Sequence, residues 1–343
     1  MPLADGISFD LTFAWAFLIA FAVFVYVVLD GFDLGLGMLF AIEPNRGDRD
    51  VMMNSVAPVW DGNETWLVLG GGGLFAAFPL AYALVLPALY APLIAMLLAL
   101  VFRGVAFEYR WRTERWRWVW DSAFIGGSSM AAFSQGVALG AFVQGIEVDE
   151  VARAYAGGWW DWLSPFSILV GVAVMCGYCL LGATWLVMKT EGPLQERMRA
   201  RAWPFGLVTL GFIGAVSLWI PFLQDGYFAR WFAGWGFLLT AGVAGAVLLV
   251  AYAMFRSLTV HHHEYRPFVL ALTLFAMCFV GLGVCLFPYI VPTEVTIWEA
   301  AAPYESQLFM MVGAAVLIPI ILAYTAYAYW VFRGKIDPEV GYH

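Results

Sequence analysis

The chain alternates between long apolar runs and short polar stretches. An apolar helix needs about 20 residues to cross a bilayer core that is ~30 Å thick. Counted at that length, the runs predict nine transmembrane helices, near residues 12–40, 54–78, 82–107, 122–144, 163–188, 204–223, 232–255, 267–290 and 308–332. We therefore expect an all-α polytopic membrane protein. Because no polar stretch is long enough for a soluble domain, residues 1–343 are expected to form a single integral membrane domain.

Composition supports the same class of protein. Hydrophobic residues make up 63% of the chain and charged residues only 12%, whereas soluble domains carry about 25% charged residues. The formal net charge of −8 argues against a nucleic-acid partner.

The distribution of Lys and Arg predicts the orientation, because loops on the cytoplasmic side carry an excess of both residues. With a periplasmic N-terminus and a cytoplasmic C-terminus, 15 of the 17 cationic residues fall on the inside. Arg153 and Arg230 are then the two on the outside, where the loops are otherwise acidic. This orientation is strongly preferred over its reverse.

Four carboxylates interrupt the first two apolar runs. Asp61 and Glu64 lie three residues apart in the second run, and Asp30 and Asp33 repeat that spacing in the first. On a helix this spacing puts both members of a pair on one face. Since a charge near the bilayer centre costs about 2.5 to 3.5 kcal/mol, these acids are expected to be protonated or to face polar groups inside the bundle.

The predicted orientation places the acids toward the cytoplasm. If the second helix begins near Asn54, a rise of 1.5 Å per residue puts Asp61 about 10 Å deep and Glu64 about 15 Å deep. Asp30 and Asp33 lie in the inner half of the first helix. We therefore interpret the acids as a proton-uptake route that begins at the cytoplasm.

A fifth acid, Glu108, is expected at the inner end of the third helix, beside Arg103. Glu108 belongs either to the proton-uptake route or to a surface ion pair with a nearby arginine. Such surface pairs contribute little to stability. The other acids also have a structural alternative, in which they are held by hydrogen bonds. The side chains available for that support are those of Asn54, Trp60, Asn63 and Trp66.

Glycines accompany the acids, at Gly31 and Gly35 in the first run and at Gly70 to Gly73 in the second. Small residues allow membrane helices to approach closely, so these positions are expected to be packing faces rather than a cofactor cleft. Histidine is confined to His261, His262, His263 and His343, outside every expected span. Because a membrane haem usually needs His or Met ligands, no haem or metal site is expected in this chain.

Several motifs together resemble subunit II of the cytochrome bd-type quinol oxidases. They are DGFDLGLG at 30–37, NSVAPVWDGNETW at 54–66, FRGVAFEYR at 102–110, LGATWLVMKTEG at 181–192, TIWEA at 296–300, PIILAYT at 319–325 and FRGK at 332–335. They run from the first expected helix to the last, so the resemblance covers the whole chain. The first two motifs together are highly specific.

The resemblance implies a multi-pass subunit of a bacterial cytoplasmic membrane oxidase. Its partner, a similar nine-helix subunit I, is expected to hold two haems b, one haem d and the quinol-oxidising loop. The complex is expected to oxidise quinol and to reduce oxygen to water with cytoplasmic protons. Subunit II is expected to brace its partner and to supply part of the proton channel, with no complete catalytic site of its own. Membrane lipid and small single-helix accessory subunits are further partners of such a complex.

Individual acids also match the family pattern. By position, Asp61 resembles the channel acid of the second helix and Asp33 an acid of the first. Glu108 stands where some members have Asp, which keeps a carboxylate but alters its reach.

Two other classes of function compete with this interpretation. The first is a proton-coupled secondary transporter that uses Asp30, Asp33, Asp61 and Glu64. Such transporters are built from repeats, but the later runs hold no convincing second copy of the acidic pair. The other is a structural scaffold with buried acids.

The orientation can be tested with single cysteines in intact cells. A membrane-impermeant maleimide is expected to label Asp149→Cys in an outside loop and to leave Thr113→Cys unlabelled in an inside loop, because of the charge bias. The four native cysteines lie in apolar runs and are expected to react little. Labelling at position 113 but not at 149 would reverse the orientation.

Overall fold

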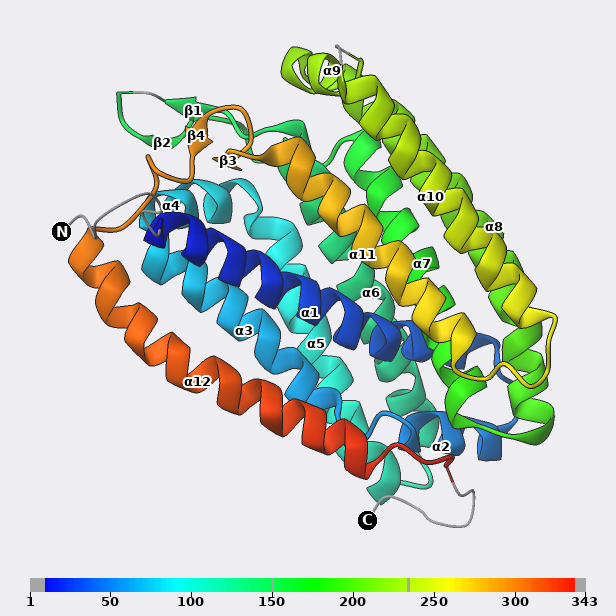
Figure 1. The fold of residues 1–343 in the computed structure, drawn as a ribbon. Coiled ribbons are helices and arrows are strands. Elements are labelled where there is room, and N and C mark those ends of the chain that lie inside the picture. The colour runs from blue at the N-terminus through cyan, green and yellow to red at the C-terminus, as the bar shows by residue number, and fades with distance from the viewer. Residues whose placement is uncertain (1–9, 150, 233–234, 337–343) are drawn as a thin grey trace.

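The computed structural model describes residues 10–149, 151–232 and 235–336, and these are almost entirely helical (Figure 1). The helices are α1 (Leu11–Leu39), α2 (Arg46–Asn54), α3 (Trp60–Ala77), α4 (Pro79–Ala88), α5 (Tyr90–Arg112), α6 (Arg117–Gln144), α7 (Pro165–Lys189), α8 (Gly192–Trp219), α9 (Asp225–Phe232), α10 (Trp235–Leu258), α11 (Arg266–Leu286) and α12 (Tyr304–Val331). Short 3-10 turns follow α1 and α8, at Phe40–Ile42 and Ile220–Phe222.

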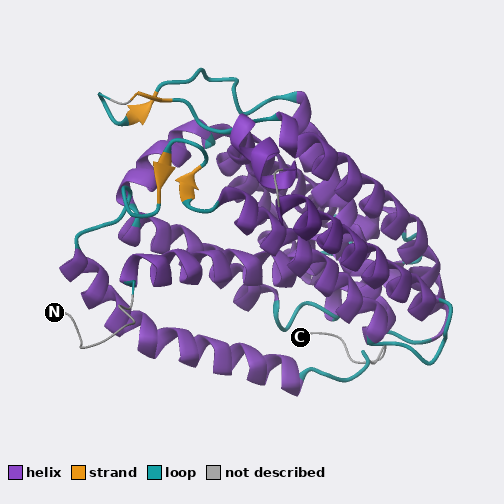
Figure 2. Ribbon diagram, turned by 45° about the horizontal axis from the view of Figure 1, so that its top comes forward, coloured by secondary structure: helices purple, strands orange, loops and turns teal. Residues whose placement is uncertain are grey.

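Two small antiparallel hairpins lie near one another at one end of the bundle (Figure 2). One pairs β1 (Val148–Asp149) with β2 (Ala154–Tyr155), and the other pairs β3 (Tyr289–Val291) with β4 (Val295–Thr296). Both occupy connections that the sequence places on the outside.

Within the described residues, seven helical stretches are long and apolar enough to cross a membrane. They are Leu11–Ile42, Tyr90–Arg112, Pro165–Lys189, Gly192–Phe222, Gly236–Leu258, Arg266–Leu286 and Tyr304–Val331. The expected spans at 54–78 and 122–144 coincide largely with α3 and α6, which are not among the seven. Acids and glycines lower the hydropathy of α3, and glycines and serines lower that of α6. The all-α multi-pass fold is therefore present, and the count of nine spans stays a prediction.

The second expected helix is broken near its start. α2 ends at Asn54 and α3 begins only at Trp60. Pro58, in the linker, lacks a backbone N–H and disfavours helical geometry in the residue before it. Asp61 consequently lies in the first turn of α3, so the unbroken helix expected from Asn54 is wrong, and the depth of about 10 Å counted along it stays a prediction. Glu64 follows about 4.5 Å further along the axis.

The third expected helix is also interrupted. α4 and α5 meet at Leu89, so the run expected at 82–107 is two helices over 79–112. The ring of Pro92 stands four residues after Ala88, where it conflicts with that residue's carbonyl group and removes a helical hydrogen bond. A kink at this place follows from the sequence.

α1 lies at the centre of the bundle and contacts α3, α6, α7, α11 and α12 (Figure 1). Its approach to α7 is the tightest. A Cβ atom on Gly35 would lie 1.7 Å from the carbonyl oxygen of Tyr178, and one on Gly182 would lie 2.5 Å from the backbone nitrogen of Leu36. Gly31 likewise faces the Tyr178 ring. The packing role expected of Gly31 and Gly35 is confirmed, and it seals the inner half of α1 from solvent.

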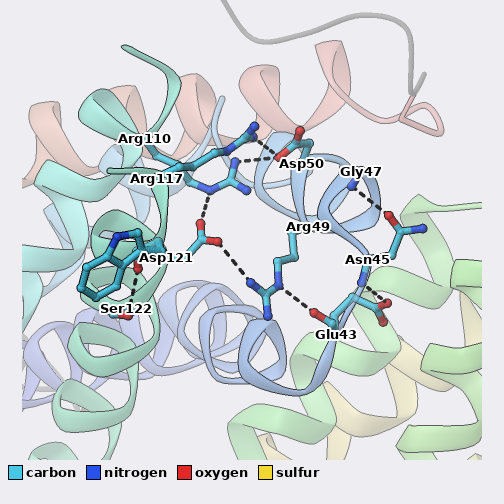
Figure 3. A network of polar contacts seen from close by, with 10 residues as sticks. Glu43, Asn45, Gly47, Arg49, Asp50, Arg110, Arg117, Asp121 and Ser122 are labelled. Carbon is cyan, nitrogen blue, oxygen red and sulfur yellow. Dashed lines mark hydrogen bonds and ion pairs between the residues drawn. The ribbon is translucent and has the colours of Figure 1, made fainter. Parts of the chain in front are cut away.

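An ion-pair network joins α2, α5 and α6 at the opposite end from the hairpins (Figure 3). Asp50 pairs with Arg110 at 2.8 Å and also with Arg117. Asp121 pairs with Arg110 at 2.6 Å and with Arg49 at 3.2 Å. We call these five residues the terminal ion-pair network.

Further pairs bring later segments to the same end. The buried Glu43 pairs with Arg201 at 2.9 Å and with Arg197 at 3.3 Å, and Lys335 pairs with Glu264 at 2.9 Å. The cation-rich segments that the sequence assigns to the inside thus share one end of the bundle. Which side of the membrane that end faces stays a prediction.

The α1–α7 contact can be tested with Gly35→Ala. The added methyl group overlaps backbone atoms of α7 and not the tip of a flexible side chain, so the helices must separate. We expect the variant to accumulate poorly and to unfold at a lower temperature. Gly211→Ala on α8, where a Cβ meets nothing within 4 Å, is the matched control. Equal yield and stability of both variants would contradict the tight contact.

Candidate functional site

A buried arginine forms ion pairs with three carboxylates in the middle of the bundle. Arg103 of α5 lies 2.9 Å from Asp30 and 3.5 Å from Asp33, both of α1. Its Nη1 atom donates to Glu64 Oε1 of α3 at 2.7 Å. We call these four residues the Arg103 cluster.

The cluster forms because each helix presents the required face. The three-residue spacing on α1 puts Asp30 and Asp33 on one side, toward α5. A guanidinium carries five N–H donors in a planar fork, so one arginine can serve several carboxylates. Arg103, Asp30 and Asp33 are fully buried, while the Glu64 side chain keeps 24% of its surface exposed.

Aromatic side chains border the guanidinium. Arg103 lies over the Phe107 ring at 5.7 Å from its centre, and Trp60 stacks on Phe107 with ring centres 4.7 Å apart. Trp60 therefore supports the site by packing, and no hydrogen bond from its indole is present among the described side chains. The indole nitrogen of Trp66 is likewise without a partner in the described chain.

Asn63 is the one expected hydrogen-bonding support that reaches the acids. Its Nδ2 atom donates to Asp33 Oδ2 at 2.8 Å and to the Leu29 carbonyl at 3.4 Å. The hydroxyl of Tyr329 on α12 donates to Asn63 Oδ1 at 2.9 Å. Both ends of the amide are thus fixed, and a residue 266 positions later in the chain is tied to the cluster.

Sequence reasoning missed both Tyr329 and a polar group on the other side of α1. Gln135 of α6 donates to the Tyr26 hydroxyl at 2.6 Å and accepts from the Tyr178 hydroxyl at 2.8 Å. Tyr26 is four residues before Asp30, so it lies about one turn along α1 from the cluster. Between Ala123 and Val143, α6 holds only small and apolar residues apart from Gln135, and that glutamine was the available signal.

Charge counting constrains the cluster. Three ionised carboxylates beside one guanidinium would leave a net charge of −2 in a largely water-free site. Burial of uncompensated charge is unfavourable, and a carboxyl group that holds a proton removes part of that charge. The arrangement is therefore suited to taking up and releasing protons.

The structure leaves two of the five expected acids outside the cluster. Asp61 is exposed in the first turn of α3, where a carboxylate interacts favourably with the helix dipole. Glu108 lies on the surface, 63% exposed, and pairs with Arg112 at 3.9 Å instead of with Arg103. Asp30, Asp33 and Glu64 are the acids that meet in space.

The three described histidines, at positions 261–263, do not fit the role of axial haem ligands, and His343 lies outside the described residues. His261 is exposed and lies 3.1 Å from Glu196, and His263 contacts Arg266 at 2.8 Å. Both belong to the α10–α11 connection, away from the apolar region where membrane haems are ligated. Over residues 10–149, 151–232 and 235–336, no group of three or more His, Cys, Asp or Glu side chains is arranged to hold a metal ion.

Comparisons with known proteins agree with one another. The family model described as cytochrome bd terminal oxidase subunit II matches residues 11–332. Cytochrome bd-I ubiquinol oxidase subunit 2 of Escherichia coli (strain K12) is 35% identical, over 96% of both chains. Cytochrome bd ubiquinol oxidase subunit 2 of Bacillus subtilis (strain 168) is 30% identical, over 94% of this chain and 96% of that one.

A solved structure has the same fold. A chain of the bd oxidase from Geobacillus thermodenitrificans aligns with a TM-score of 0.78, covering 94% of this chain and 98% of that chain at 17% sequence identity.

The energetic role of Arg103 can be tested with Arg103→Met. The variant leaves Asp30 and Asp33 buried without their cation, which typically costs about 3–5 kcal/mol. We expect a lower unfolding temperature and a lower yield of purified complex. Arg112→Met is the control, because Arg112 and Glu108 are 79% and 63% exposed and such pairs contribute ~0–1 kcal/mol. If both variants unfold at the same temperature, the cluster does not stabilise the fold.

Proposed function

Because the chain belongs to the cytochrome bd terminal oxidase subunit II family, we propose that it supplies part of the proton-uptake path of a bd-type quinol oxidase. The chain is a subunit of a cytochrome bd ubiquinol oxidase. Reduction of oxygen to water consumes protons, and this chain's acids are suited to deliver them from the cytoplasm. Family membership replaces the transporter interpretation of the same residues.

The observation that carries this proposal is the Arg103 cluster. Fully buried Asp30 and Asp33 share a guanidinium with the partly exposed Glu64. A group of acids that cannot all be ionised is able to accept a proton from one side and pass it to the other. Arg103 keeps the carboxylates close together while their protonation changes.

Asp61 and Glu64 supply an approach to the cluster from the surface of this chain. They lie on one face of α3, Asp61 exposed and Glu64 in contact with Arg103. An ionised side chain that faced lipid at this position would be costly. We propose that subunit I covers this face of α3, so that the acids line a path between the two subunits.

The proposed division of labour follows from the histidines. Haem b and haem d are assigned to subunit I, since the histidines of this chain lie outside its apolar helices. The haems and the quinol substrate supply the redox chemistry when bound there, and this chain braces its partner in a bacterial cytoplasmic membrane. Its own residues hold, orient and move protons.

The proton path can be tested with Asp33→Asn and Asp61→Asn. Asn keeps the shape of each side chain but cannot carry a proton, so quinol oxidase turnover is expected to fall by on the order of 10²-fold. The complex should assemble with its normal haem absorption. Glu108→Gln is expected to have a smaller effect, because Glu108 lies outside the Arg103 cluster.

Oxygen consumption with excess quinol measures the turnover of all three variants. Normal turnover in both Asp variants would exclude the proton path and favour a structural role for the acids.

A further inference from the structure

A cavity opens near the end of the bundle where the terminal ion-pair network lies. Its volume is about 240 Å³. Its walls come from the α2–α3 linker, the end of α7 and the end of α12 with the residues that follow, and include Ser55, Trp185, Lys189, Tyr329 and Lys335. The cavity is large enough for several water molecules, each of which occupies about 30 Å³ in the liquid.

Lys189 and Lys335 shape the outer wall of this cavity. The Lys189 ammonium donates to the carbonyl oxygens of Phe332 and Gly334, the latter at 2.9 Å. Lys335 donates to the Thr190 carbonyl at 2.9 Å and pairs with Glu264 at 2.9 Å. These bonds pin the segment after α12 across the end of α7.

The inner wall of the cavity leads to the buried acids. Tyr329 lines the cavity and donates its hydroxyl proton to Asn63 Oδ1 at 2.9 Å. The other end of that amide donates to Asp33 at 2.8 Å. Tyr329 and Asn63 thus join the cavity wall to an acid of the Arg103 cluster through two hydrogen bonds in series.

We propose that this cavity is a second proton-uptake opening, contained within this chain, and that Tyr329 and Asn63 connect it to Asp33. The proposal rests on the proton-path function proposed above. It differs from the path along Asp61 and Glu64, because Asn63 and Glu64 are adjacent on α3 and point about 100° apart. Glu64 turns toward α5 and Asn63 toward α12, so the two openings meet at the cluster.

The proposed transfer leaves Tyr329 unchanged. A hydroxyl group both donates and accepts hydrogen bonds, so its oxygen takes a proton from a hydronium ion in the cavity, which becomes water, while its own proton departs toward Asp33. A water molecule beside the Asn63 amide bridges the remaining distance, as proton transfer allows. One proton moves from the cavity to the Asp33 carboxylate, and a neutral tyrosine is restored. Asn63 is a positioning residue, because its amide does not release a proton near neutral pH.

The decisive variant is Tyr329→Phe in the intact oxidase. The ring keeps its edge contact with Trp185, at 6.3 Å between ring centres, so assembly and haem absorption should persist. Because the path along Asp61 and Glu64 bypasses the cavity, Tyr329→Phe is combined with Asp61→Asn. Turnover of this double variant is expected to fall on the order of tenfold below that of Asp61→Asn, and the solvent deuterium isotope effect on turnover should rise as proton uptake becomes limiting. Tyr327→Phe, whose ring is 62% exposed on the same helix, should leave both quantities unchanged.

Parallel measurement of Asp33→Asn separates the two proposals. If Asp33→Asn is slow but adding Tyr329→Phe to Asp61→Asn changes neither turnover nor the isotope effect, the cavity proposal is overturned while the proton path stands. If Asp33→Asn and Asp61→Asn both turn over normally, the proton path itself fails.

A second measurement decides the matter if Tyr329→Phe does not assemble. Val331→Cys places a thiol on the cavity wall, and attachment of a bulky maleimide there should reduce turnover relative to the parent protein treated in the same way. Full turnover after complete modification would overturn the proposal.

Discussion

The guanidinium of Arg103 is the constraint on which the centre of this protein depends. It is buried among three carboxylates from two other helices, and neither the cation nor the acids are stable there alone. Each helix therefore fixes the position of the others. The close approach of α1 to α7 at Gly35 and Gly182 excludes water from one side of the Arg103 cluster. Because the effective dielectric constant is low there, the ion pairs of the cluster are stronger and breaking them is more costly.

α5 connects the Arg103 cluster to the terminal ion-pair network. Arg110 stands seven residues after Arg103, about two turns along the same face, and it is also buried. There it joins Asp50 and Asp121 in the terminal ion-pair network (Figure 3). The more exposed members of that network are worth little individually. Their combined geometry nevertheless sets the position of α5, and with it the position of the Arg103 guanidinium.

Polar groups approach the Arg103 cluster from two sides. Asn63 and Tyr329 lie on one side of the Arg103 cluster, and Glu64 followed by Asp61 lies on another. In the proposed path, a proton that enters by either side reaches carboxylates whose total charge favours its uptake. The partner subunit, to which the haems are assigned in this proposal, would then draw protons from a group that this chain refills.

The sequence by itself determined the class of fold, because runs of apolar residues and the cost of an exposed backbone in lipid leave helices as the solution. It also placed Asp30 with Asp33 and Asp61 with Glu64, since the helical period acts over three or four residues. Only the tertiary structure decided that Arg103 serves three of those acids, that Glu108 stays on the surface, and that Tyr329 reaches Asn63. Those contacts join residues far apart in the chain. Pro58 and Pro92 mark the helix breaks locally, but no local pattern encodes how closely whole helices pack.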